Sequence, residues 1–283
     1  MPFELIPVYL KFTFIWRAII VGLLTSLCAG LIGVNLVLKR YSMIGDGLSH
    51  VGFGILAITV VIGLPPLQTA IPIILIVAFL LLRLRENSKT KGDAAIALIS
   101  VSALAIGVTT FSLTSGMNSD MSNYMFGSIL TLTESDLYVC IVTSTIVLLV
   151  YVLFYAKNFA LTFDSDFAKA SGVRVDLYNL FTALMTALIV VVGMRMMGAM
   201  LISGLIIFPP LTAIRLFKSY KMVAIASGVL STICFIIGIL ASFVLSTPVG
   251  ASVIITNLCV FCLCLIIGYM KILIKKHNRR LRM

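Results

Sequence analysis

Long apolar stretches, separated by short polar connections, follow one another along the whole chain. An α-helix needs about 20 apolar residues to cross the hydrocarbon core of a bilayer, and about nine stretches approach or exceed that length. They cover residues 14–38, 43–63, 67–82, 93–115, 136–156, 177–194, 197–217, 222–246 and 251–270. The two stretches around Met194–Met200 can instead form one broken helix, which lowers the count to eight. The pattern predicts an all-α, polytopic transmembrane helix bundle, with residues 1–283 in a single domain.

Composition supports a membrane protein and argues against a soluble one. Of the 283 residues, 61% are hydrophobic and 11% are charged, and the mean hydropathy is +1.17. A soluble domain needs many more charged residues to cover its surface. Within a bilayer, every backbone N–H and C=O must find a partner inside the protein, and a helix supplies these partners along its own length. We therefore expect a multi-pass protein of the cell membrane.

The basic residues predict an orientation. The chain has 21 Lys and Arg against 10 Asp and Glu, which gives a net charge of +11. Most of the basic residues fall in alternate connections, at 39–40, 83–91, 157–174, 215–221 and 271–282. Because cytoplasmic loops are enriched in Lys and Arg, these connections and the C-terminus are expected inside and the N-terminus outside. The basic cytoplasmic tail 271–283 then faces anionic membrane lipid, and no nucleic acid is expected as a partner.

Two ionisable residues lie within the second apolar stretch, where charge is costly and therefore indicates function. Asp46 and His50 are four residues apart in GDGLSH, so they share one face of a helix. Counted from Arg40 at about 1.5 Å per residue, Asp46 lies roughly 9 Å and His50 roughly 15 Å into the membrane. His50 is then expected near the middle of a hydrocarbon core about 30 Å thick.

The chemistry of this pair favours a metal ion. Imidazole and carboxylate together suit zinc, and also manganese or iron. The alternative interpretation is a hydrogen-bonded pair that only joins helices. The glycines around the pair are expected to keep its surface open: Gly45, Gly47, Gly52 and Gly54. An ion-transport site with two protein ligands would leave positions for water or other helices, so that the ion can depart.

Other polar residues receive weaker interpretations. Asp120 and Asn123, in the outer connection 115–135, either guide an ion at the mouth of the path or are simply solvated. Arg195, near the outer end of its apolar stretch, is expected to extend its charge to the membrane interface, and no chemistry is assigned to it. The dipeptide Pro209–Pro210 predicts a break or kink in the seventh stretch.

The cytoplasmic connection 157–176 predicts a short surface helix. It contains FALTFDSDFAKASGVRVD, with Ala168 and Gly172 in an A-x-x-x-G spacing. Glycine is the residue that most often ends a helix, so the helix is expected to end at Gly172. A helix parallel to the membrane at this position would dock into a partner protein.

The cysteines do not predict a metal centre or a disulfide framework. Cys259, Cys262 and Cys264 lie together in one apolar stretch, with no second cluster in any loop. Free cysteine behaves as a small hydrophobic residue, so all three are expected to be buried fillers.

Four segments together resemble the metal-permease family of ATP-binding-cassette importers, which carries zinc and manganese. They are SMIGDGLSHVGFG (42–54), NYMFGSIL (123–130), TFDSDFAKASGV (162–173) and VVGMRMMGAMLISGLIIFPPLTA (191–213). The resemblance covers nearly the whole chain and implies a permease of the bacterial plasma membrane with a divalent metal ion as transported substrate. Manganese-type members often have A-V-L-P-G after the His, where this chain has Val51-Gly52-Phe53-Gly54. That departure favours zinc, with manganese next.

The same resemblance implies roles for particular residues. Asp46 and His50 would line the metal path. Asp164, Ala168 and Gly172 match the D-x-x-x-A-x-x-x-G of the coupling helix that docks into the ATPase. The permease would be a homodimer with two cytoplasmic ATPase subunits, and an extracellular metal-binding protein would deliver the ion. The chain itself would be no enzyme and would bind no cofactor stably.

Other functions remain open at this point. The sequence has no GxxxxGK[ST], so ATP hydrolysis would belong to a separate subunit. A permease for a chelate such as haem, a siderophore or cobalamin would need no ion ligands like Asp46 and His50. A secondary cation transporter would work without an ATPase, with Asp46 carrying a proton. An intramembrane enzyme is disfavoured, because there is no HExxH and no nucleophile with its base.

Overall fold

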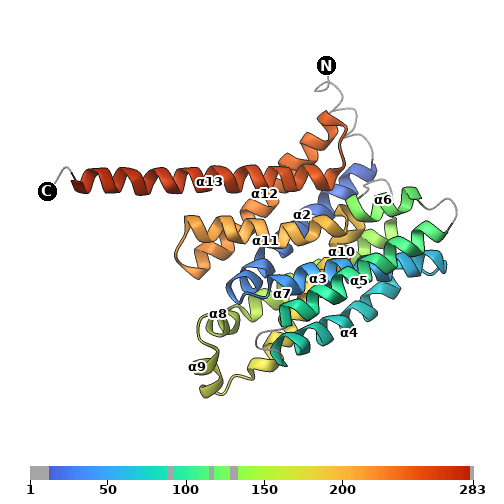
Figure 1. Ribbon diagram of the computed structural model, residues 1–283, viewed down its shortest axis with the longest axis horizontal. Helices are drawn as coiled ribbons and strands as arrows, with labels where there is room; N and C mark the ends of the chain where they lie inside the picture. The colour runs from blue at the N-terminus through green and yellow to red at the C-terminus, as the bar shows by residue number, and fades with distance from the viewer. Residues whose placement is uncertain (1–12, 88–91, 115–117, 128–132, 281–283) are drawn as a thin grey trace.

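The regular structure in the described part of the chain is entirely helical. This computed structural model describes residues 13–87, 92–114, 118–127 and 133–280 (Figure 1). The helices are α2 (Thr13–Leu38), α3 (Ser42–Val61), α4 (Pro66–Asn87), α5 (Gly92–Leu113), α6 (Asn118–Phe126), α7 (Glu134–Leu153), α8 (Tyr155–Phe163), α9 (Ser165–Ala170), α10 (Val175–Met197), α11 (Ala199–Leu216), α12 (Tyr220–Leu245) and α13 (Val249–Arg280). The predicted all-α bundle is confirmed.

The predicted spans correspond to separate helices. Within the described ranges, eight helices are long and apolar enough to cross a membrane: α2, α3, α4, α5, α7, α10, α12 and α13. The stretch predicted at 197–217 is the shorter helix α11, whose 18 residues reach about 27 Å. A turn at Gly198 divides α10 from α11, so the chain has two helices where one broken helix was the alternative. The chain is a multi-pass membrane protein.

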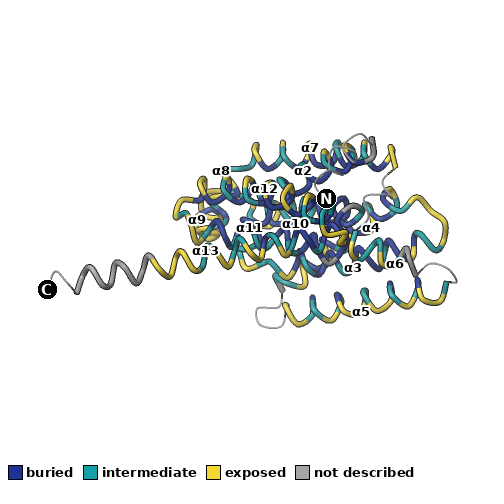
Figure 2. The backbone as a smooth tube through the Cα atoms, turned by 90° about the horizontal axis from the view of Figure 1, so that it is seen from above, coloured by how far each residue is buried: buried dark blue, intermediate teal, exposed yellow. Residues whose placement is uncertain are grey.

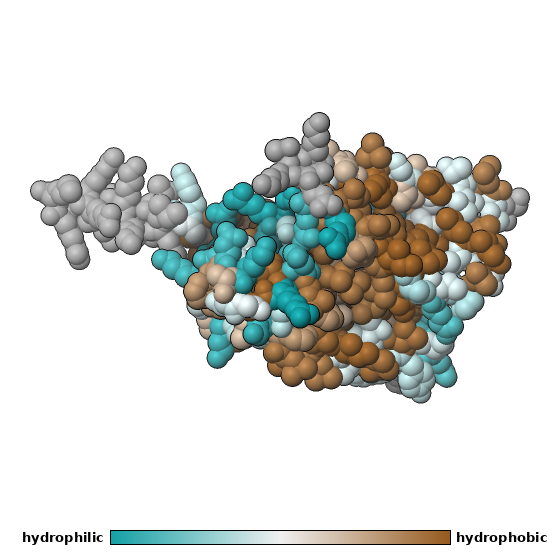
Figure 3. Space-filling model, turned by 90° about the horizontal axis from the view of Figure 1, so that it is seen from below, coloured by the Kyte–Doolittle hydropathy of each residue, from teal (hydrophilic) through white to brown (hydrophobic). Residues whose placement is uncertain are grey.

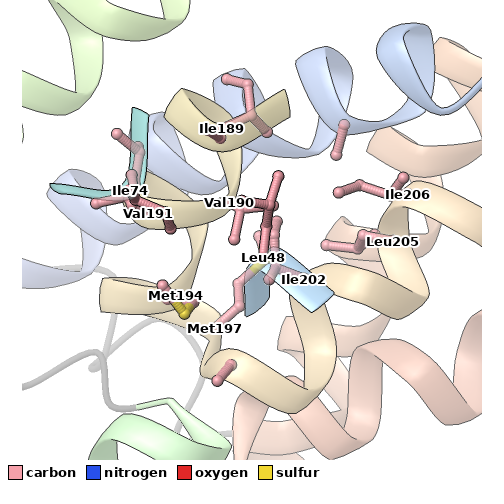
Figure 4. Packing of buried hydrophobic residues seen from close by; sticks show 14 of the residues in the cluster. Leu48, Ile74, Ile189, Val190, Val191, Met194, Met197, Ile202, Leu205 and Ile206 are labelled. Carbon is pink, nitrogen blue, oxygen red and sulfur yellow. The ribbon is translucent and has the colours of Figure 1, made fainter. Parts of the chain in front are cut away.

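The centre of the bundle is formed by α2, α3, α10 and α11. In the most apolar part of α2, α3 and α10, more than half of the residues are buried, whereas less than a third are buried in α5, α7 and α13. Figure 2 shows α5 and α7 at opposite edges of the bundle, with the buried segments between them. In the core, Leu48 of α3 packs with Val190 of α10 and Ile202 of α11 (Figure 4). The helix that carries Asp46 and His50 therefore lies in the most buried part of the molecule.

Pro209 and Pro210 do not break α11, which runs on to Leu216. Proline at position 210 has no N–H to give to the carbonyl of Ile206, four residues earlier. A Cβ built on Gly33 of α2 would lie 2.0 Å from that oxygen and 2.8 Å from Pro210 Cγ. A glycine thus lets α2 pack directly against this part of α11.

The cysteine prediction is wrong for the cluster on α13. Cys259 and Cys262 are exposed and Cys264 is half-buried. The stretch is apolar on all sides, so its pattern does not indicate which face packs against α11 and α12. Helix α13 extends beyond the other helices at one end of the bundle (Figure 1). Its last turns, residues 271–280, belong to the basic segment that was predicted as a tail.

The two ends of the bundle differ in character. Helices α8 and α9 lie at one end and α6 lies at the other (Figure 1). Figure 3 shows hydrophilic side chains gathered toward the α8–α9 end, beside a broad hydrophobic band. The positive-inside rule assigns the α8–α9 end to the cytoplasm and the α6 end to the outside.

Candidate metal path

The candidate ligands stand on the first half of α3. Asp46 and His50 are one turn apart, and 3.8 Å separates His50 Nε2 from Asp46 Oδ2. The His50 side chain is 20% exposed and the Asp46 side chain 37% exposed. Met43, one turn before them, is also exposed. The pair therefore lies on a face of α3 that this protomer leaves partly open.

The imidazole of His50 is not satisfied by the protein around it. Its Nδ1 is buried and has no hydrogen-bond partner among the described residues. The 3.8 Å separation between His50 Nε2 and Asp46 Oδ2 is too long for a hydrogen bond. A buried nitrogen without a partner costs free energy unless something else binds it. In the described part of the chain, the pair is therefore not a hydrogen-bonded strut between helices.

Asp46 and His50 do not form a complete coordination shell. No group of three or more His, Cys, Asp or Glu side chains that would hold an ion occurs among the described residues. Further ligands for an ion would have to be water, backbone oxygens, or groups from another chain on the open face. An incomplete shell suits an ion that must be released.

The four glycines around the pair do not keep the surface open, contrary to the prediction. A Cβ on Gly54 would lie 2.7 Å from the backbone oxygen of Ala103 in α5, and one on Gly52 would meet Met194 of α10. A Cβ on Gly47 would lie 2.8 Å from Ile96 Cγ2 of α5. These glycines bring α5 and α10 against two faces of α3, as small residues commonly do in membranes. They fix the direction in which the remaining face points.

The outer candidates are not brought to the pair. Asn123 is half-buried in the short helix α6, and no described contact joins it to Asp46 or His50. Asp120 also lies in α6, but its side chain is outside the described part. Helix α6 contacts α10, α11, α5 and α3. It therefore covers the outer ends of the helices that surround the candidate path.

Arg195 is a functional candidate that the sequence interpretation missed. It does not reach out to the interface: its Nε lies 3.2 Å from Asp136 Oδ2, and both side chains are only 10% exposed. Its Nη1 also donates to the hydroxyl of Tyr124 in α6. Asp136 belongs to a capping box with Thr133 at the start of α7. The ion pair joins α10 to α7 at the outer end, and the hydrogen bond to Tyr124 adds α6.

An aromatic series connects this outer network to α3. The ring of Tyr124 stacks on Phe111 of α5, with centroids 5.9 Å apart. Phe111 in turn contacts Phe53, with centroids 6.0 Å apart. Phe53 lies three residues after His50 on α3. These ring contacts therefore connect α6, through α5, to α3, the helix that carries Asp46 and His50.

We expect Gly198→Ala to loosen the attachment of α6. Gly198 has φ +87°, and a Cβ there would lie 2.3 Å from the backbone oxygen of Met125. The strain and the clash together should destabilise the protein by more than about 1 kcal/mol. The matched control is Gly63→Ala, where φ is +76° but nothing lies within 4 Å. Thermal unfolding should show a clearly larger loss for Gly198→Ala, and equal losses would contradict the contact with α6.

The predicted surface helix is present as α9. Asp164 is its N-cap, and its side chain accepts a hydrogen bond of 2.8 Å from Phe167 N–H. Ala168 is 1% exposed, so it faces the protein. Gly172 has φ +83°, and Val173 N–H donates back to Ala168 C=O, as in a Schellman motif. Phe167 is 67% exposed and projects from the same short helix.

Comparison with known proteins places the chain in a family. The helix bundle is that of a polytopic membrane protein. Residues 11–268 match the ABC 3 transport family, and the chain belongs to that family. A chain in the solved structure "PsaBC from Streptococcus pneumoniae in complex with Fab" has a TM-score of 0.83 and 26% identity, over 93% of this chain and 95% of that one.

Relatives with named functions fall into two groups. The manganese import system permease protein ScaB of Streptococcus gordonii is 27% identical over 250 residues, 88% of this chain and 90% of ScaB. The high-affinity zinc uptake system membrane protein ZnuB of Haemophilus influenzae is 27% identical over 254 residues, 90% of this chain and 97% of ZnuB. Equal identity to both relatives gives no preference for either metal.

Proposed function

We propose that this chain is the membrane-spanning permease subunit of an ATP-driven importer for divalent transition-metal ions. The observation that carries the proposal is the buried, unpartnered Nδ1 of His50 beside the Asp46 carboxylate, on a central membrane helix. The names of the relatives ScaB and ZnuB support the same interpretation. Both zinc and manganese accept imidazole and carboxylate ligands. Zinc is proposed first and manganese next, because Val51-Gly52-Phe53-Gly54 stands where manganese-type members often have A-V-L-P-G.

Asp46 and His50 would bind the metal ion transiently during its passage. An ion that arrives from outside exchanges part of its water shell for the two side chains. Because they are only two ligands, the ion is held weakly enough to leave when the bundle opens inward. A second copy of the chain on the open face of α3 would enclose the path and offer a second pair of ligands. Asp120 and Asn123, on the outer side, would meet the ion earlier.

The partners follow from what this chain lacks. Without a phosphate-binding loop in its sequence, it would depend on cytoplasmic ATPase subunits for energy, and on an extracellular metal-binding protein for delivery. Helix α9 is the proposed contact with the ATPase. Its N-cap, its buried Ala168 and its terminal Gly172 hold a short, preformed helix that exposes Phe167 at the cytoplasmic end.

We expect Asp164→Ala to weaken ATPase docking. Loss of this N-cap should destabilise α9 by about 1 kcal/mol, which is a large fraction of the stability of so short a helix. ATPase subunits co-expressed with the variant should co-purify poorly, and metal uptake should fall. Ser219→Ala is the matched control, since it removes an N-cap from a different helix, α12. Full co-purification with Asp164→Ala would rule out α9 as the docking helix.

The function itself is tested by whole-cell metal content, measured by elemental analysis. Cells with the complete system should accumulate more zinc than cells that lack only this chain. A rise in manganese alone would keep the importer and change its substrate. No change in any divalent metal, with the subunits assembled, would favour a permease for a chelate. Uptake by liposomes that contain this chain without an ATPase would instead indicate a secondary transporter.

A further inference from the structure

A groove at the cytoplasmic end separates α4 from the segment that follows α9. It encloses about 580 Å³ and runs between the last turns of α4 and the first turns of α10. Gly172 and Val173, at the end of α9, form part of its wall. The groove extends along about two turns of α4 and the first turns of α10. Both of these segments belong to predicted membrane spans, at the ends of the spans that face the cytoplasm.

The inner wall of the groove is apolar and belongs to two membrane-spanning helices. Phe79 and Leu82 line it from α4, and Leu177 and Leu180 line it from α10. Phe79 is 39% exposed and Leu177 is 43% exposed, although both lie in helices that cross the membrane. In a bilayer, such a surface is covered by an acyl chain, because water there would solvate apolar side chains.

The outer rim of the groove carries basic residues without acidic partners. Arg83, Lys169 and Arg174 line the rim and are exposed, and none forms an ion pair with a carboxylate in the described part of the chain. The guanidinium of Arg83 lies over the ring of Phe79, 5.4 Å from its centroid. This contact fixes a positive charge directly above the apolar wall.

The acidic residues of the groove do not neutralise this rim. Glu86 accepts a hydrogen bond of 3.0 Å from Asn179 Nδ2, and Asn179 Oδ1 accepts one of 2.9 Å from Lys39 Nζ. Burial lowers the pKa of Lys39 to about 8, although Glu86 raises it. Glu86 is thus engaged with residues behind the groove. Asp176 also lines the groove, so three cations face one carboxylate that lacks such a partner.

We propose that this groove binds one anionic phospholipid of the cytoplasmic leaflet. Its phosphate would contact Arg83, Arg174 and Lys169, and an acyl chain would cover Phe79 and Leu180. Basic pockets between membrane helices on the cytoplasmic side are typical sites for anionic headgroups. The bound lipid would join α4 to the end of α9, and it would therefore support the segment that docks to the ATPase. Binding of the lipid does not depend on the proposed metal function.

The test is lipid binding by the purified permease without its ATPase. The delipidated protein in detergent receives phosphatidylglycerol or phosphatidylcholine with the same acyl chains, and native mass spectrometry counts the lipid retained. The wild type should retain phosphatidylglycerol preferentially. Arg83→Gln with Arg174→Gln should weaken its affinity about 30-fold, as expected for two basic residues near an anionic surface. Arg83→Lys with Arg174→Lys should largely keep it, which separates loss of charge from loss of folding.

A control variant removes the same charge elsewhere. Lys218 lies in the connection between α11 and α12 and Lys221 in the first turn of α12, at the same end of the bundle but outside this groove, and the control variant is Lys218→Gln with Lys221→Gln. This variant should bind phosphatidylglycerol like the wild type. Equal retention of both lipids by the wild type, or an equal loss in both Gln variants, would overturn the site. The proposal also fails if the Arg83 and Arg174 substitutions leave lipid binding unchanged but abolish ATPase co-purification, because the cations would then serve an acidic protein surface.

Discussion

His50→Ala should abolish metal uptake while the protein still inserts, folds and binds its ATPase. The substitution removes one of the two proposed side-chain ligands, Asp46 and His50. Losing a residue that merely orients a metal ligand commonly costs 10–100-fold, so losing a ligand should cost more than about 100-fold in transport. Folding should change little, because Nδ1 of His50 makes no hydrogen bond to any described residue and its Nε2 lies 3.8 Å from Asp46 Oδ2.

The measurement is initial uptake of zinc by cells or proteoliposomes that contain the complete importer. His277→Ala is the matched control, since it removes the other histidine of the chain from the basic C-terminal segment. Asp46→Asn keeps the shape of the carboxylate and removes its charge, and it should give a loss similar to that of His50→Ala. A purely structural pair would instead lose thermal stability along with transport. Normal transport by His50→Ala would show that the path has been placed on the wrong residues.

Most of the bundle could be predicted from sequence because the membrane imposes simple rules. Span length, backbone satisfaction and the location of Lys and Arg all leave traces in one dimension. Helix α9 could also be predicted, because its N-cap Asp164 and the Gly172 that follows it are signals in the local sequence. The pair Asp46 and His50 was also visible, because two ionisable residues within an apolar stretch stand out against their surroundings.

The misses all concern which face of a helix meets which neighbour. Cys259 and Cys262 face outward because a span that is apolar on every side carries no facial signal. The glycines of α3 were interpreted as open surface, yet they mark the closest helix contacts, as Gly54 does against Ala103. Pro209 and Pro210 sit within a continuous helix, and Gly33 of α2 packs closely against Pro210. Only tertiary packing supplies this information.

Arg195 is the most instructive miss, since its partner is far away in sequence. Asp136 precedes it by 59 residues, and Tyr124 by 71. The sequence does contain one signal, because Thr133 and Asp136 have the spacing of a capping box at the start of α7. The capping box already accounts for Asp136 at the start of α7, so the sequence gives no reason to look for its second role, the ion pair with Arg195. A basic residue just inside a predicted span should be tested for an acidic partner at the same depth of another span.

Arg195→Met should destabilise the protein more than any other single substitution in the outer network. It leaves the Asp136 carboxylate, 10% exposed, without its cation, and breaking a buried ion pair in this way costs about 3–5 kcal/mol. Transport should fall with stability, since Tyr124 and α6 lose their anchor above the aromatic series that leads to α3. Adding Asp136→Asn should recover part of the stability, because an amide needs no cation and can still accept the hydrogen bond from Thr133 N–H.

A neighbouring pair provides the control for this experiment. Arg17 and Glu134 are 2.5 Å apart, but their side chains are 27% and 72% exposed. Breaking such an exposed pair with Arg17→Met should cost no more than about 1 kcal/mol, since water and salt screen its charges. Thermal unfolding of the purified variants in detergent compares the two. If Arg195→Met and Arg17→Met cost the same, the Arg195–Asp136 pair is not a buried anchor, and the outer end of the bundle must be held by apolar packing. If Arg195→Met loses more thermal stability than Arg17→Met, and Asp136→Asn restores part of it, the buried ion pair is what stabilises the outer end of the bundle.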